Sequence, residues 1–453
     1  MSREPLSAET KKTDNTAKRL LLFAAKLGYQ TRSFEDAARK LGAQLVYVTD
    51  RCHQLEDPWG DQAIPVHFES LENAAYTVME TLQRQGQEVS GVLALGDRPA
   101  AAAAYAARGL GVPYNHPAAV EACRSKLRTR EVFRDAGLRV PWFGSFPIAP
   151  ILEPSLQGIP FPCVLKPLSL SASQGVIRAN NREQFFLAAA RLRELLESPE
   201  IRATREPNLD QMVVEGFIPG NEVAVEGLLR DGTLRILAIF DKPDPLEGPY
   251  FEETIYITPS RLPETTQNEI ERCARDAVRA LGLTQGPVHA EFRINQDGVW
   301  PIEVAARPIG GLCARALRFR ANNANDADDR IGLEELLLRH ALNLPGSEAP
   351  RELRASGVMM IPVPQSGILE SVSGEEAARA TPGITELILT ARLHDYIAAW
   401  PEGSSYLGFL FATGDSAEEV EQAIRAAHKE LEFRITPRLP VEHPVTQRLP
   451  AAS

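Results

Sequence analysis

Three lysines stand out because lysine is otherwise missing from most of the chain. Between Leu41 and Ala427 the sequence has 33 arginines and only three lysines, Lys126, Lys166 and Lys242. A lysine ammonium is a compact point charge on a flexible stem, which suits phosphate oxygens, whereas the arginine guanidinium is a planar fork. The three lysines are therefore candidate phosphate ligands, although a general drift toward arginine would also leave a few lysines behind.

Two glutamates are expected to face each other across a β-hairpin. Residues Asn295 to Gly298 have turn-forming types and separate two runs in which apolar and polar residues alternate. If the turn is centred on Asp297, Glu291 lies directly opposite Glu303. Side chains alternate between the two faces of a strand, so His289 shares the face of these carboxylates.

Two carboxylates in this position need a cation between them. At an effective dielectric near 20, charges about 4 Å apart repel by roughly 4 kcal/mol, and like charges directly opposite each other destabilise a sheet. Mg²⁺ bound to nucleotide phosphates suits the position, because it takes a few carboxylates and keeps its other ligands for phosphate and water. The alternative is a solvated strand face on which the glutamates pair with Arg293 and Arg307.

A loop of small residues follows Lys166. Ser169, Ser171, Ser173 and Gly175 leave little side chain in the way, so backbone N–H groups of this loop can approach phosphate closely. A serine-rich hairpin turn is the alternative. The chain has no GxxxxGK[ST] motif, and no GxGxxG fingerprint follows its first predicted strand, so a P-loop or dinucleotide-binding site is not supported.

A second candidate nucleotide segment lies around the turn Pro219–Gly220. This turn separates two predicted strands, and Glu222, Ala224 and Glu226 lie on one face of the second strand. Carboxylates accept hydrogen bonds from ribose hydroxyls, although surface glutamates on a half-buried strand would show the same pattern.

The composition is that of an acidic, multidomain globular protein. With 453 residues, 44% of them hydrophobic, the chain is too long for one core, and about two to four domains are expected. The net charge of −11 argues against general nucleic-acid or anionic-membrane binding. Five cysteines without a CxxC pair indicate free thiols in a reducing compartment. The apolar stretch Leu20–Ala25 is too short for a membrane span, so we expect a cytoplasmic protein.

Periodicity and composition divide the chain into regions. These are a disordered leader (1–18), an alternating β and α region with a small parallel sheet (19–120), an α+β region split near residue 205 (121–345), a small α/β domain (346–441) and a tail (442–453). Within the second region, a helix over 121–136 is predicted to carry Lys126.

Taken in order, these segments resemble the ATP-grasp family. The ordered set consists of Lys126, Cys163–Pro167 with its small-residue loop, Val214–Glu222, Lys242, Glu291 and Ile302–Arg307. It covers roughly residues 20 to 345 and is more specific than any one of its parts. The resemblance implies a mixed α/β and α+β fold, with a Rossmann-like domain before the ATP-grasp domain and a small α/β domain after it.

Within that family the chain is most similar to carboxylate-amine ligases of the L-amino acid ligase and carnosine synthase type. The resemblance implies an enzyme that uses ATP and Mg²⁺, with Mn²⁺ as the alternative ion, to activate a small carboxylate as an acyl phosphate and join it to an amine. The implied partners are these small molecules, not nucleic acid or a membrane, and a homodimer is a family-level expectation. A bicarbonate-using carboxylase and a non-catalytic ATP-binding regulator are the alternatives.

The resemblance also assigns roles to individual residues. The implied ATP ligands are Lys126, Lys166, Ser171, Ser173, Gly175, Glu215, Phe217, Ile218, Glu222 and Lys242, and the implied metal ligands are Glu291 and Glu303. The implied catalytic residues are Arg307, Lys242 and His289. The implied substrate residues are Glu253, Tyr256, Arg307, Gly310 and Gly311.

The chain departs from the family pattern at three of these segments. Ala305 stands where the family usually has a metal-binding asparagine, and Tyr256 stands where amino-acid ligases often have histidine. Gln174 replaces an arginine in the small-residue loop. A polar insertion over 321–330 has the composition of a mobile lid or of a plain disordered loop.

Overall fold

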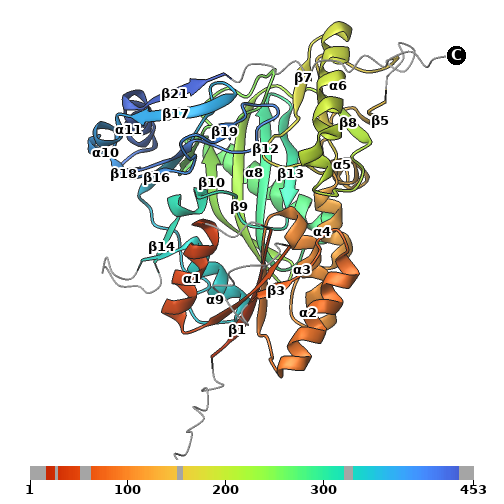
Figure 1. Ribbon diagram of the computed structural model, residues 1–453, viewed down its shortest axis with the longest axis vertical. Helices are drawn as coiled ribbons and strands as arrows, with labels where there is room; N and C mark the ends of the chain where they lie inside the picture. Colours follow the sequence, from red (N-terminus) through yellow and green to blue (C-terminus); the bar gives the residue numbers. More distant parts are fainter. Residues whose placement is uncertain (1–16, 26–28, 51–62, 150–156, 321–329, 438–453) are drawn as a thin grey trace, which may run out of the picture.

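The computed structural model describes residues 17–25, 29–50, 63–149, 157–320 and 330–437. The predicted leader up to residue 16, nearly all of the polar insertion and the tail lie outside the described residues. Figure 1 shows the N-terminal elements at the bottom in red and orange and the central strands in green above them. The C-terminal elements, in blue, lie at the upper left.

The N-terminal region contains the small parallel sheet that its alternating pattern predicted. Its strands, in spatial order, are β3 (Ala63–Pro65), β2 (Gln44–Thr49), β1 (Arg19–Ala24) and β4 (Gly91–Leu95). All the strand pairs in it are parallel. The helices of this region are α1 (Tyr29–Leu41), α2 (Leu71–Gln85) and α3 (Asp97–Leu110). The alanines of α3 are buried, so this helix packs closely against its neighbours.

The single helix predicted over 121–136 was wrong, because the chain forms two helices there. They are α4 (Pro117–Arg124) and α5 (Lys126–Asp135). Ser125 between them has the extended angles φ −97° and ψ 108°, and its side chain accepts a hydrogen bond from the N–H of Arg128. This is an N-cap, which starts a new helix. It places Lys126 at the first position of α5, where the Lys126 N–H donates to the carbonyl of Leu168 at 3.0 Å.

A four-stranded antiparallel sheet carries the small-residue loop. Its strands, in spatial order, are β5 (Phe143–Pro147), β8 (Gln211–Gly216), β6 (Cys163–Pro167) and β7 (Ile177–Ala179). The loop connects β6 to β7, and α6 (Arg182–Glu197) packs against both strands before the short helix α7 (Pro199–Arg202).

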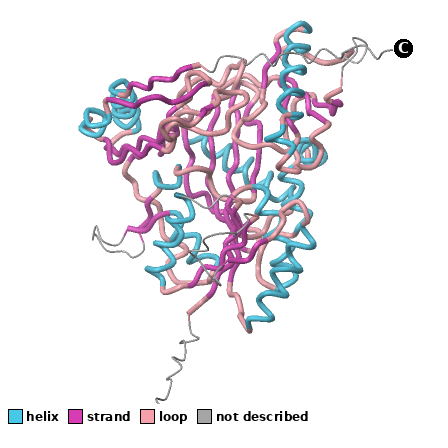
Figure 2. The backbone as a smooth tube through the Cα atoms, viewed as in Figure 1, coloured by secondary structure: helices cyan, strands magenta, loops and turns pink. Residues whose placement is uncertain are grey.

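The central sheet runs through the middle of the molecule (Figures 1 and 2). Its strands, in spatial order, are β13 (Gly298–Ala305), β12 (Gly286–Asn295), β9 (Asn221–Arg230), β10 (Thr233–Asp241), β11 (Ile255–Thr258), β16 (Ala355–Ile361), β20 (Gly408–Gly414) and β18 (Ile384–Leu389). Helix α8 (Glu264–Leu281) packs on β10 and β13. The chain is thus a mixed α/β protein, as expected.

The C-terminal elements extend this sheet. The strand pairs described there are all antiparallel. They include the pair of β11 with β16 and the two pairs of a separate three-stranded sheet. The remaining elements are β14 (Arg318–Arg320), β15 (Arg330–Gly332), α9 (Leu333–Ala341), β17 (Gly367–Ser373), α10 (Glu375–Ala380), β19 (Tyr396–Ile397), α11 (Ala417–Glu430) and β21 (Glu432–Thr436), with a 3₁₀ helix over Cys313–Ala316.

The hairpin of β12 and β13 has the predicted pairing at the end away from its turn. Glu291 lies opposite Glu303, and His289 lies opposite Ala305. Toward the turn the register shifts by one residue, because Phe292 pairs with Pro301 and leaves Ile302 as an extra residue. Such a bulge bends the strand that carries it. The carboxylate pair therefore lies beside an irregularity that a simple count from the turn does not reveal.

Candidate active site

A cavity of about 1030 Å³ brings together residues from every folded region of the chain. The predicted site residues that line it are Lys126, Lys166, Ser171, Ser173, Glu215, Phe217, Ile218, Glu222, Glu253, Tyr256, His289, Glu291, Glu303, Arg307, Gly310 and Gly311. Among the predicted residues, Lys242 and Gly175 lie outside the lining. Gly175 is buried, and its N–H donates to the carbonyl of Pro401 at 2.8 Å.

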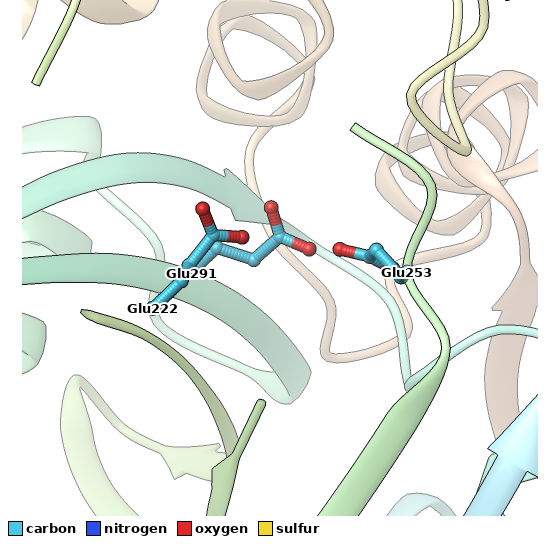
Figure 3. A group of neighbouring side chains, drawn as sticks. All are labelled: Glu222, Glu253 and Glu291. Atoms are coloured by element: carbon cyan, nitrogen blue, oxygen red, sulfur yellow. The ribbon is translucent and has the colours of Figure 1, made fainter. Parts of the chain in front are cut away.

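Lys242 lies inside a cluster of three glutamates. Its Nζ is 2.8 Å from Glu222 Oε1 and 3.2 Å from Glu291 Oε1, and it also contacts Glu253. Figure 3 shows these carboxylates converging, with Glu222 and Glu291 on neighbouring strands and Glu253 approaching from the opposite side. Carboxylate oxygens of the three lie within 4.8 Å of one another.

The charges of this cluster shift the pKa values of its members. Burial alone would lower the pKa of Lys242, but Glu222, Glu253 and Glu291 hold that pKa well above its usual range. Burial, reinforced by the negative charge of Glu291, raises the pKa of Glu253 to about 7. The Tyr256 hydroxyl donates to Glu253 at 2.7 Å. The protonated lysine therefore fills the position that a metal ion would take in an acidic cluster of this size.

Lys166 is held by a buried ion-pair network. Its Nζ is 2.7 Å from Glu215 Oε2, and Glu215 Oε1 is 2.9 Å from Arg130 Nε. Burial would raise the pKa of Glu215, but the two cations outweigh it and lower that pKa to about 2. The carboxylate of Glu215 thus fixes Lys166 at the cavity wall.

Lys126 approaches the same cavity from the start of α5. Its Nζ donates to the carbonyl of Leu170 at 2.6 Å and lies 3.8 Å from Glu303 Oε2. The structure thus brings Lys126 and the loop after Lys166 to one wall, next to the carboxylate pair of the hairpin.

Phe217 lies close to two guanidinium groups. Its ring centroid is 4.0 Å from Cζ of Arg178 and 5.1 Å from Cζ of Arg293. Arg293 also donates to the carbonyl of Ile218 at 2.7 Å and to Glu222 Oε2 at 2.8 Å. The N–H of Phe217 donates to the carbonyl of Pro162 at 3.0 Å. Arg293 therefore pairs with Glu222 and not with the hairpin glutamates, as the alternative interpretation of the hairpin would have required.

His289 and Arg307 each have a carboxylate partner. His289 Nδ1 lies 3.1 Å from Oε2 of the fully buried Glu226, whose Oε1 accepts from the N–H of Ile309 at 3.1 Å. Burial opposes the charged imidazole, but hydrogen bonds to Glu226 and Glu291 raise the pKa of His289 to about 9. These hydrogen bonds thus favour the charged form of His289 in the cavity wall.

Arg307 is bound by a residue of the N-terminal region. Its Nε is 3.1 Å from Asp97 Oδ1, and its NH2 is 3.3 Å from Asp97 Oδ2. Asp97 is the first residue of α3, where a carboxylate also interacts favourably with the helix dipole. Burial would lower the pKa of Arg307, but Asp97 raises it above its usual value.

Sequence reasoning missed Asp97 and Arg130 as parts of the site. Asp97 belonged to a segment that had only the pattern of a packed helix, and Arg130 was one arginine among many. Each makes its contact across a long stretch of sequence, 210 residues for Asp97 with Arg307 and 85 for Arg130 with Glu215. A charged residue on the buried face of a helix was the available signal at Arg130.

Comparisons with known proteins agree with this geometry. A family model described as an ATP-grasp domain matches residues 159–316, and one described as L-amino acid ligase C-terminal domain 2 matches residues 359–436. The crystal structure of L-amino acid ligase from Bacillus licheniformis superimposes with a TM-score of 0.76 at 28% identity, covering 92% of this chain and 99% of that one.

Residues 159–316 thus form an ATP-grasp domain. Its ATP-grasp domain is followed by a domain of the L-amino acid ligase type. Alanine–anticapsin ligase of Bacillus subtilis (strain 168) is 29% identical over 45% of this chain and 44% of its own length. Carnosine synthase 1 of Gallus gallus is 28% identical over 76% of this chain and 37% of its own length. The chain thus spans less than half the length of these two relatives.

The loop after Lys166 and the segment around Phe217 line the same cavity as Glu253, Tyr256, Gly310 and Gly311. Among the described residues, no helix is both long enough and apolar enough to cross a bilayer.

Proposed function

We propose that the protein is an ATP-dependent ligase that activates a small carboxylate, such as that of an amino acid, and joins it to an amine. The observation that carries this proposal is that two lysines, an arginine and a pair of opposed glutamates line one cavity. The names of the relatives support it, since alanine–anticapsin ligase, carnosine synthase and L-amino acid ligase share the ligation of small acids and amines.

The reaction has two steps, each of which forms one bond and breaks another. A carboxylate oxygen attacks the γ-phosphorus of ATP and the bond to the β-phosphate oxygen breaks, which gives ADP and an acyl phosphate. The amine nitrogen then attacks the acyl carbon and loses a proton. The bond between the acyl carbon and the phosphate oxygen breaks, and inorganic phosphate leaves. Because no protein nucleophile takes part, catalysis consists of positioning and neutralisation of charge.

The cations of the cavity have distinct roles in this proposal. Lys126 and Lys166 neutralise the ATP phosphates, and the loop carrying Ser171 and Ser173 covers them. Arg307, held by Asp97, stabilises charge on the transferring phosphoryl group and on the tetrahedral intermediate. Lys242 is tied to three glutamates and acts mainly by keeping those carboxylates in place.

The remaining predicted residues complete the two halves of the site. Backbone groups near Phe217 and Ile218 meet adenine, and Glu222 lies close enough to this wall to accept from ribose. On the other side Glu253 accepts from a substrate ammonium, and Gly310 and Gly311 offer backbone N–H groups to a substrate carboxylate. The ring of Phe409 comes within 3.2 Å of the position that a Cβ at Gly311 would take, so a larger residue there would narrow the pocket.

Glu291 and Glu303 fit a magnesium ion. They lie directly opposite each other and both line the cavity, and Mg²⁺ takes few carboxylates and completes its six ligands with water and phosphate. Ala305 supplies no side-chain ligand, so the ion would rely more on ATP and water than in relatives with asparagine. When bound, Mg²⁺ supplies charge neutralisation at the transferring phosphoryl group.

The test is Mg²⁺-dependent phosphate release from ATP with pooled amino acids, other small carboxylates and amines, followed by mass spectrometry of the products. We expect release that requires both an acid and an amine and that falls at least about a hundredfold in Glu303→Gln. The matched control is Glu271→Gln on the exposed face of α8. Release stimulated by bicarbonate without an amine would point to a carboxylase, and nucleotide binding without any release would overturn the ligase.

A further inference from the structure

The small-residue loop over 169–175, here called the phosphate loop, is held by a segment from near the other end of the chain. This segment, residues 399–406, is called the C-terminal loop. Three hydrogen bonds join the two loops, from Trp400 Nε1 to Ala172 O (3.0 Å), from Gly175 N to Pro401 O (2.8 Å) and from Gln174 Nε2 to Glu402 O (2.7 Å).

An ion pair fixes the C-terminal loop to the helix that follows the phosphate loop. Glu402 accepts from Arg191 of α6 through both carboxylate oxygens, at 2.5 Å and 2.8 Å. Two-pronged pairs of this kind specify orientation as well as adding attraction. Trp400 is 6% exposed, and its ring lies tilted against that of Tyr406 in the same loop, with the ring centroids 5.0 Å apart. The C-terminal loop is thus fixed both by its own packing and by the ion pair with α6.

The phosphate loop needs such support. Ala172 and Ser173 have φ angles of 55° and 53°, in the left-handed region that residues other than glycine adopt at a cost. A strained conformation of this kind persists only when surrounding contacts enforce it. The bond from Trp400 to the carbonyl of Ala172 acts directly on one of the two strained residues.

The C-terminal loop also lines the cavity, next to residues that we assign to the substrate. Ser404, Ser405 and Tyr406 line the cavity together with Phe409. The Tyr406 and Phe409 rings are 6.3 Å apart, and Phe409 packs against Gly311. One short segment therefore contacts both the expected nucleotide side and the expected substrate side.

We propose that Trp400 and Glu402 are positioning residues that hold the phosphate loop in its nucleotide-binding conformation and link that conformation to occupancy of the substrate pocket. This inference rests on the proposed ATP-dependent function. Neither residue touches the reacting atoms. Their effect is on the fraction of molecules whose loop is ready to bind ATP, and a ligand's apparent affinity falls in proportion to that fraction.

The test compares nucleotide affinity in matched variants. Trp400→Phe keeps most of the buried ring but removes the indole donor, and Glu402→Gln weakens the pair with Arg191. Titration calorimetry with a non-hydrolysable ATP analogue and Mg²⁺ should give a Kd raised roughly fivefold in each, the effect of losing one hydrogen bond. The control is Glu386→Gln, because Glu386 pairs with Arg315 through both oxygens at 2.8 Å but does not touch the phosphate loop.

A rescue experiment separates positioning from general damage. The double variant Arg191→Glu with Glu402→Arg reverses the pair and should recover most of the lost affinity. In turnover assays the single variants should raise KM for ATP more than they lower kcat, and should release more phosphate per amide formed, because a looser loop admits water to the acyl phosphate.

The outcomes distinguish this inference from the proposed function. Nucleotide affinities in Trp400→Phe and Glu402→Gln equal to that of Glu386→Gln would overturn the positioning role even if the enzyme ligates normally. A wild-type protein that binds the analogue but forms no amide would overturn the ligase, while the comparison of Kd values would still decide the role of the C-terminal loop.

Discussion

At the scale of single residues, the direction of the Arg307 guanidinium depends on Asp97. The Asp97 carboxylate binds Nε and NH2 of the arginine, while NH1 donates to the carbonyl of Pro308 at 3.1 Å. These contacts leave the guanidinium little freedom to turn. A residue of the N-terminal region therefore positions the cation that we place at the transferring phosphoryl group.

Asp97→Asn is expected to lower kcat by about tenfold or more, because a hydrogen bond between charged groups contributes roughly 1.5–3 kcal/mol. The Kd for the ATP analogue should change far less, since the lysines and the phosphate loop remain. Steady-state kinetics and calorimetry on the same preparations would check this. The control is Asp276→Asn, which changes an exposed pair with Arg279 on α8. An unchanged kcat in Asp97→Asn would remove Asp97 from the mechanism.

At the scale of elements, helix α9 places a histidine against the arginine that ends strand β9. His340 Nδ1 lies 3.2 Å from NH2 of Arg230, the last residue of β9, and that arginine also donates to Ser347 Oγ at 2.9 Å. Burial and the charge of Arg230 lower the pKa of His340 to about 4. The packing of α9 thus favours the neutral imidazole.

This contact should make the protein sensitive to mild acid. The unfolded chain binds a proton at His340 near pH 6.5, whereas the folded protein does so only near pH 4, so the free energy of unfolding falls as the pH drops between these values. The full loss is about 3 kcal/mol at most, at 1.36 kcal/mol per pKa unit. Urea unfolding from pH 7.5 to 4.5 should show a shallower decline in His340→Gln. The exposed His67→Gln should keep the wild-type slope, and identical slopes in all three proteins would contradict the argument.

Elements differ in how far the sequence predicts them. The hairpin of β12 and β13 was predictable because its turn residues and its alternation are local, and the pairing of Glu291 with Glu303 follows from them. The bulge at Ile302 was not predictable, since the alternation of residue types on either side of the turn carries no sign of an extra residue. The break at Ser125 had a local signal, a serine three residues before the N–H it caps, but the helical pattern on either side concealed it.

The site shows the same division between local and distant information. Motif residues such as Glu215 and Arg307 were identifiable because each belongs to a short stretch of distinctive spacing. Their partners Arg130 and Asp97 were not, because they reach these residues only after the chain has folded. The sequence likewise gave no sign that Lys242 would be surrounded by glutamates, since Glu222, Glu253 and Glu291 come from separate elements.

At the scale of the whole molecule, the C-terminal region shares its sheet with the ATP-grasp domain. Strand β11 pairs with β16 over four residues, from Ile255 with Met359 to Thr258 with Ser356. Ile255 and Ile257 belong to the same apolar cluster as residues of β16, β20 and α11. The phosphate loop also depends on contacts with this region. Binding of ATP and integrity of the C-terminal strands should therefore be coupled.

A chain that ends at residue 345 is accordingly expected not to form a stable ATP-grasp fold. It would leave β11 as an unpaired edge strand and expose apolar side chains. Each of these side chains contributes about 1.5–3 kcal/mol when buried, so a few of them together equal the roughly 5–15 kcal/mol by which domains are stable. The full chain should unfold in one calorimetric transition, while the truncated chain should be poorly soluble and bind a hydrophobic dye. Co-expression with residues 346–453 should restore soluble protein if the sheet can reassemble. A soluble, cooperatively unfolding 1–345 fragment that binds ATP as tightly as the full chain would show that the shared sheet contributes little, and would also remove the basis for coupling through the C-terminal loop.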